Sequence, residues 1–137
     1  MAVIKSINHI AVVVDNMEKA LAFCSDALGI EIHELRDVPA EKSQVAFLPL
    51  AGAEVELVMP TSDDSGIAKY LAKRGPGMHH LCLEVDGIEG MLSHLKQKKI
   101  RLINEGPLTG ADGKKYAFIH PESTKGVLVE LYELTPL

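Results

Sequence analysis

Two stretches of the chain carry the same pattern, His9-Ile-Ala-Val-Val-Val-Asp15 and His80-Leu-Cys-Leu-Glu-Val-Asp86. At the same offset, Ala46-Phe47-Leu48-Pro49 matches Ala117-Phe118-Ile119-His120. Three extra residues follow in the second copy, after which Val55-Glu56-Leu57 matches Val129-Glu130-Leu131. Matches that recur in one order indicate an internal repeat, and a repeat decides the architecture before any local structure does.

Each copy begins with a strand pattern that leads into a helix. Residues 7–14 are rich in β-branched side chains, and their alternation puts His9, Ala11 and Val13 on one face of a strand. We expect Asp15 or Asn16 to begin a helix that Gly29 ends, and Asp86 to begin its counterpart. The apolar stripes of the two helices are Met17, Leu21, Cys24 and Leu28 in the first copy, and Ile88, Met91, Leu92 and Leu95 in the second.

Further strands follow each helix. The first copy has strand patterns at 44–50 and 53–59, joined by a tight turn at 51–52, and the second copy has them at 116–120 and 126–134. Residues 110–115, Gly-Ala-Asp-Gly-Lys-Lys, indicate a hairpin turn. A phosphate contact is the alternative, but the spacing of a dedicated phosphate loop is missing.

The repeat predicts one domain over residues 1–137, because neither copy is large enough to close a core alone. Module 1 covers about 1–60 and module 2 about 77–137. The linker between them, about 61–76, holds a short helix around 67–73. The predicted fold class is α+β, with two paired βαβββ modules that form an open, U-shaped mixed β-barrel.

Composition excludes several classes of function. Lys and Arg total 14 against 19 Asp and Glu, for a net charge of −5, so nothing favours binding to nucleic acid. No apolar stretch approaches the roughly 20 residues of a membrane helix. A strand pattern that starts at Val3 leaves no room for a leader peptide, and Cys24 and Cys82 are typical of buried thiols in a reducing compartment. We therefore expect a cytoplasmic protein that binds something small and does not associate with membranes.

The repeat also places chemistry at equivalent positions. His9 and His80 match on the first strands of the two copies, and Glu56 and Glu130 match on the later ones. If the modules pack about a pseudo-twofold axis, two imidazoles and two carboxylates converge. Two nitrogen and two oxygen ligands suit one borderline divalent ion, such as cobalt, zinc, nickel or manganese.

Ordinary structural roles compete with this interpretation. A strand histidine is often a hydrogen-bonded core residue, and each Glu lies between apolar neighbours, so it could point to solvent. Leu128 and Tyr132 share the face of Glu130, however, and an unpaired carboxylate is costly to bury unless a metal offsets the cost. Cys82 is expected on the face of His80, where it lines the site without acting as a nucleophile. We interpret the remaining histidines as structural (His79) or surface residues (His33, His94 and His120).

At these residues the chain resembles the vicinal-oxygen-chelate superfamily and, within it, the methylmalonyl-CoA epimerases. The resemblance covers about residues 7–133. Its most specific segments are Gly77-Met78-His79-His80-Leu81 and the run from His120-Pro121 to Val129-Glu130-Leu131, supported by Asn8-His9-Ile10-Ala11-Val12, Val45-Ala46-Phe47-Leu48-Pro49 and Val55-Glu56-Leu57.

The resemblance implies the vicinal-oxygen-chelate fold and an isomerase with one divalent metal ion, held by His9, Glu56, His80 and Glu130. It implies epimerisation of an acyl-CoA thioester, methylmalonyl-CoA, at the α carbon through an enolate-like intermediate. Glu130 is the first candidate for the catalytic base and Glu56 the second. Some of these epimerases carry a proposed second base near the position of Ala46, and alanine cannot act as a base. Whether Glu41 takes that role stays open.

The same resemblance implies a homodimer and leaves other functions open. A glyoxalase I-type lactoylglutathione lyase would use the same ligands, a ring-cleaving dioxygenase would fit Glu56 less well, and a relative that sequesters small molecules would need no metal. The candidates for contact with the CoA part of the substrate are Lys114, Lys115 and Lys125, and no geometric argument supports them.

Overall fold

A computed structural model describes residues 2–110 and 112–134. By its internal contacts the chain divides into two compact units. The first consists of Met1–His9 with His80–Leu137, and the second of Ile10–His79. Strand β1 (Val3–Val13) begins in the first unit and ends in the second, and β5 (Gly77–Asp86) runs from the second into the first. The boundaries of the two sequence modules stay a prediction.

The second unit contains strands in the order β2-β3-β4-β1, of which β2, β3 and β4 pair antiparallel. Strand β3 (Ser43–Leu50) pairs on one side with β2 (Glu34–Val38) and on the other with β4 (Ala53–Pro60), with the expected turn at 51–52. The other elements of this unit are α1 (Met17–Leu21), the π-helical turn η1 (Ala22–Ala27), the 3-10 turn η2 (Pro39–Glu41) and α2 (Gly66–Arg74).

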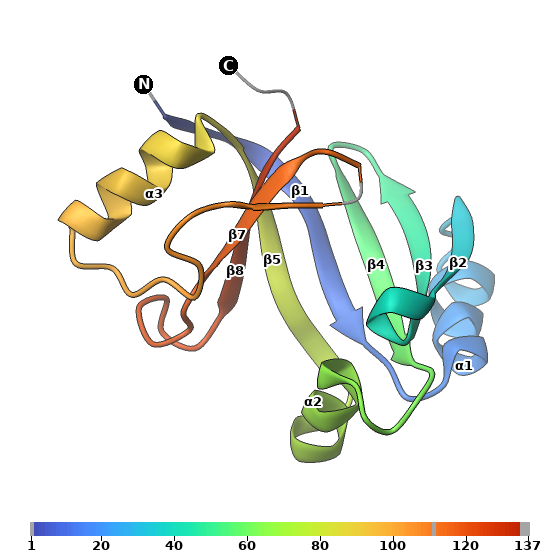
Figure 1. Cartoon of the computed structure of the whole chain (residues 1–137). Coiled ribbons are helices and arrows are strands. Elements are labelled where there is room, and N and C mark those ends of the chain that lie inside the picture. Colours follow the sequence, from blue (N-terminus) through green and yellow to red (C-terminus); the bar gives the residue numbers. More distant parts are fainter. Residues whose placement is uncertain (1, 111, 135–137) are drawn as a thin grey trace. The chain divides into compact units, whose positions relative to one another are not determined.

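The first unit contains strands in the order β1-β5-β8-β7-β6, with β5 parallel to β8 (Leu128–Glu133). Strand β7 (Lys115–Ile119) pairs antiparallel with β8 and with the two-residue β6 (Leu108–Thr109). The β6–β7 hairpin is the expected one, although Ala111 in its turn lies outside the described residues. Helix α3 (Ile88–Gln97) packs on this sheet and contacts β8 (Figure 1).

Alternation along the strands gives the sheet of the first unit two different faces. Val85, Ala117 and Leu131 point towards α3 and form a buried core with Ile88 and Leu92. Because successive side chains alternate, the neighbouring residues of β5, β7 and β8 lie on the opposite face. His80, Phe118 and Glu130 are among them, so the sequence pattern that builds the core also directs these polar groups to the face away from α3.

Both helix predictions need one correction at an end. Leu28 is 58% exposed and does not pack, because the chain passes from α1 into the π-helical η1 and the apolar stripe loses its register. Asp86 does not cap α3: Gly87 occupies the N-cap with a φ of 73°, and the Glu133 carboxylate accepts a hydrogen bond from the Ile88 N–H at 2.8 Å. Asn16 caps α1, as one of the two expected residues.

None of the helices within the described ranges is long and apolar enough to cross a membrane.

Candidate active site and metal centre

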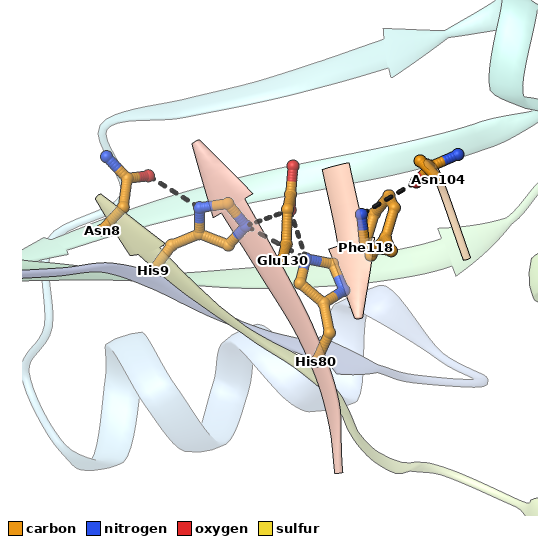
Figure 2. Close-up of polar contacts among 6 residues, drawn as sticks. All are labelled: Asn8, His9, His80, Asn104, Phe118 and Glu130. Atoms are coloured by element: carbon orange, nitrogen blue, oxygen red, sulfur yellow. Dashed lines mark hydrogen bonds and ion pairs between the residues drawn. The ribbon is translucent and has the colours of Figure 1, made fainter. Parts of the chain in front are cut away.

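Three of the four predicted metal ligands meet on the face of the first unit opposite α3. The His80 Nε2 atom lies 3.1 Å from Glu130 Oε1 and 3.1 Å from His9 Nε2, and His9 Nε2 lies 3.6 Å from Glu130 Oε1. Figure 2 shows the three side chains projecting from β1, β5 and β8 towards one point. They are largely shielded from solvent, with side-chain exposures of 10%, 14% and 13% for His9, His80 and Glu130.

The spacing of these atoms fits a shared metal ion. Two ligands that each lie about 2.1 Å from one ion are about 3.0–3.4 Å apart at octahedral or tetrahedral angles. The three separations, 3.1, 3.1 and 3.6 Å, fall at or just above that range. The donor chemistry agrees, since two imidazoles and a carboxylate are the ligands that a borderline divalent cation prefers.

Burial keeps His9 in the form that a metal requires. Desolvation lowers the pKa of His9 from 6.5 to about 4, the Glu130 charge opposes that shift, and His80 adds a smaller lowering. His9 is therefore neutral at neutral pH, with a lone pair to offer.

Neighbouring residues hold the two histidines in place. The Asn8 Oδ1 atom lies 2.8 Å from His9 Nδ1. The Phe118 ring meets the His80 ring edge-on, with centroids 5.8 Å apart, and the Phe118 N–H donates to Asn104 Oδ1 at 2.8 Å (Figure 2). No role could be predicted for Asn8, Asn104 or Phe118, because no periodicity or spacing marks residues that act through a neighbour.

Cys82 lies beside the three ligands, as expected from its position two residues after His80. It is fully buried, and its sulfur is within 4.8 Å of a ligand atom of His9 and of Glu130. In the parallel pair β5–β8 its Cα stands opposite that of Glu130. The thiol therefore contributes to the floor of the site.

Glu56 belongs to the second unit. It lies on β4, where its register partner on β3 is Phe47, and it is partly buried. Arg36 lies over the Phe47 ring at 5.1 Å, and the pKa of Arg36 is raised mainly by its hydrogen bond to Glu34, with a small contribution from the Glu56 charge. The place of Glu56 among the ligands stays a prediction.

The remaining predicted residues lie elsewhere. Glu41 is exposed in η2, and Ala46 is fully buried in the core of the second unit. His79 packs edge-on against Tyr70 with centroids 4.7 Å apart, which agrees with a structural role. His33 and His94 are exposed, and the His120 Nδ1 atom accepts a hydrogen bond from the Glu122 N–H.

The family of this chain is shown by comparison with known proteins. Residues 8–118 match the model of the Glyoxalase/Bleomycin resistance protein/Dioxygenase superfamily, so the chain belongs to that superfamily and has its α+β fold. This is the superfamily also called vicinal oxygen chelate, which the sequence motifs indicated.

Within the superfamily the similarity is to one kind of enzyme. The chain is 44% identical over 126 residues to the mitochondrial methylmalonyl-CoA epimerase of Bos taurus, covering 91% of this chain and 72% of that protein. It is 36% identical over 130 residues to the ethylmalonyl-CoA/methylmalonyl-CoA epimerase of Cereibacter sphaeroides, covering 93% and 97%. A solved methylmalonyl-CoA epimerase in complex with methylmalonyl-CoA and NH4+ superposes with a TM-score of 0.82 at 26% identity, covering 96% and 95%. The prediction of an isomerase of the epimerase type is confirmed.

Proposed function

We propose that this chain catalyses the metal-dependent epimerisation of methylmalonyl-CoA at its α carbon. The convergence of His9, His80 and Glu130 carries the proposal, together with similarity to named epimerases over more than nine-tenths of the chain. The acyl-CoA substrate is supported by the solved relative that contains methylmalonyl-CoA.

Each residue has a defined task in this reaction. His9, His80 and Glu130 would hold the divalent ion, and the internal repeat supports Glu56 as the fourth ligand, because it matches Glu130 in sequence. When bound, the ion would supply a Lewis acid that stabilises negative charge on the thioester oxygen. Two imidazole and two carboxylate ligands suit each of the ions predicted from the sequence, which are cobalt, zinc, nickel and manganese.

The carboxylates of Glu130 and Glu56 would transfer the proton. Glu130 removes the α proton as general base, which breaks the C–H bond and leaves the electron pair delocalised towards the thioester oxygen. A second group returns a proton to the opposite face of the planar intermediate, and this inverts the carbon. Glu56 is the candidate for that group, since Glu41 is exposed and Ala46 carries no acid.

The first experiment measures solvent deuterium uptake at the α carbon of methylmalonyl-CoA in heavy water. We expect uptake with the metal-loaded protein, loss of uptake with a chelator, and recovery when metal is added back. Absence of uptake by folded, metal-loaded protein would refute the epimerase assignment. Turnover of a glutathione hemithioacetal by the same sample would then favour the glyoxalase alternative, and a protein that binds no metal would favour sequestration.

Variants of the two carboxylates separate their roles. Glu130→Gln is expected to fold and lose most turnover, whereas Glu122→Gln, at a carboxylate 71% exposed and paired with Arg101, keeps it. With Glu56→Gln, inversion should stop while one epimer still exchanges its proton, because the remaining base serves one face. Full inversion by Glu56→Gln would remove Glu56 from the reaction.

The homodimer and the cytoplasmic location stay predictions. Light scattering of the purified chain tests the first: a mass near twice 14.9 kDa supports a dimer, and a mass near 14.9 kDa contradicts it.

A further inference from the structure

The contact between Asn8 and His9 has a consequence for the proton on the imidazole. The Asn8 amide oxygen lies 2.8 Å from His9 Nδ1, a normal hydrogen-bond length. An amide oxygen only accepts, so the hydrogen must come from the ring nitrogen. A neutral imidazole carries one N–H, and the contact therefore places it on Nδ1 and leaves the lone pair on Nε2.

That lone pair faces the point where the other ligands meet. His9 Nε2 is the atom that lies 3.1 Å from His80 Nε2 and 3.6 Å from Glu130 Oε1. In the opposite tautomer an N–H would project into this point and no lone pair would be available for a cation. The Asn8 contact thus decides whether His9 presents a ligand or a hydrogen to the site (Figure 2).

The same contact restrains the ring. Rotation about the outer side-chain bond of histidine is broad and roughly two-fold, so packing alone distinguishes poorly between the ring and its flipped form. A flip would exchange Nδ1 for a ring carbon opposite the Asn8 oxygen and lose the hydrogen bond. Because His9 is 8% exposed, water has little access to replace the lost partner.

We propose that Asn8 is a positioning residue, whose amide oxygen holds His9 in the Nδ1-protonated tautomer with Nε2 directed at the metal centre. Hydrogen-bonded partners of metal-binding histidines commonly act in this way. An amide provides the acceptor without adding a charge, whereas a carboxylate at the same place would also raise the basicity of the imidazole. The inference about metal binding rests on the proposed function, but the inference about the tautomer does not.

The test uses the full chain and three variants. Asn8→Ala removes the acceptor, Asn8→Asp keeps an acceptor oxygen, and Ser6→Ala is the matched control. Ser6 lies two residues earlier on β1, and its hydroxyl donates to Glu84 at 3.1 Å, so the control also loses one side-chain hydrogen bond. Circular dichroism checks that each variant is folded.

The first readout is ¹⁵N NMR of the metal-free protein at neutral pH, with the His9 signals assigned by their loss in His9→Gln. We expect a pyrrole-type shift at Nδ1 and a pyridine-type shift at Nε2 in the wild type, Asn8→Asp and Ser6→Ala. In Asn8→Ala the two nitrogens should show averaged shifts. An unchanged tautomer in Asn8→Ala, or an Nε2-protonated wild type, would overturn the proposal.

The second readout is affinity for Zn²⁺, measured by competition with a chromogenic chelator. Asn8→Ala should bind about ten- to a hundredfold more weakly, while Asn8→Asp and Ser6→Ala bind at least as tightly as the wild type. Equal affinity of Asn8→Ala and wild type would overturn the role in metal binding. If the wild type binds no Zn²⁺, the proposed metal site fails, and the NMR result still decides the role of Asn8 in the tautomer.

Discussion

Glu133→Ala tests how the first unit begins helix α3. The Glu133 carboxylate is 5% exposed and accepts the Ile88 N–H at 2.8 Å, across 45 residues of sequence. Ile88 is fully buried, so its N–H has no access to water when the carboxylate is removed. Leaving a buried donor unsatisfied costs roughly 1–3 kcal/mol. Loss of a negative charge at a helix N-terminus adds about 0.3–1 kcal/mol.

We therefore expect Glu133→Ala to lower the free energy of unfolding by about 2–3 kcal/mol. Glu133→Gln keeps an acceptor and loses the charge alone, so its cost should be about 0.3–1 kcal/mol. Asp86→Ala is the matched control, because the sequence favoured Asp86 as the cap and the structure shows it in a partly exposed pair with Lys5 at 3.7 Å. Such a pair contributes up to about 1 kcal/mol.

Urea denaturation followed by circular dichroism measures these differences through the transition midpoint. The order of destabilisation should be Glu133→Ala, then Glu133→Gln and Asp86→Ala. The reasoning is refuted if Asp86→Ala costs as much as Glu133→Ala, since the helix would then depend on the local residue.

Three further predictions concern pH and ligands. The folded-state pKa of His9, about 4, lies below its ordinary 6.5, so its contribution to stability is complete above pH 6.5 and is lost as the pH falls towards 4. The metal-free protein should lose roughly 1–3 kcal/mol of unfolding free energy over that interval, and His9→Gln should show a shallower dependence; equal slopes in acid denaturation would contradict this. Burial and a 2.5 Å hydrogen bond to Asp112 raise the pKa of Tyr132 above its ordinary 10. The stability that this shift contributes is complete below pH 10 and is lost as the pH rises from there through the raised value. Ultraviolet titration should therefore detect the Tyr132 phenolate at a lower pH in Asp112→Asn, and an unchanged midpoint would exclude the contact. Zn²⁺ at a hundred times its dissociation constant should stabilise the protein by about 2.7 kcal/mol, and this gain should vanish in His80→Ala.

Much of the fold could be predicted because the repeat and the strand alternation are visible in the sequence itself. The strands over 43–60 and 115–133 agree closely with expectation, and so does the apolar stripe of α3. One error lies where a local rule meets a distant partner. Asp86 has the right chemistry for a cap, but Gly87 takes a left-handed conformation and a carboxylate from β8 provides the hydrogen bond.

The candidate site, too, could be predicted in part. Matching positions in the repeat were enough to nominate His9, His80 and Glu130, because equivalent positions on paired strands share a face. The residues that orient them, Asn8, Asn104 and Phe118, could not be predicted. Their contacts depend on hydrogen-bond distances and ring angles, and no sequence periodicity indicates these. The sequence by itself determined which side chains are available to a metal. Tertiary structure decided that three of them meet within 3.6 Å, because β1, β5 and β8 are brought together only when the sheet forms.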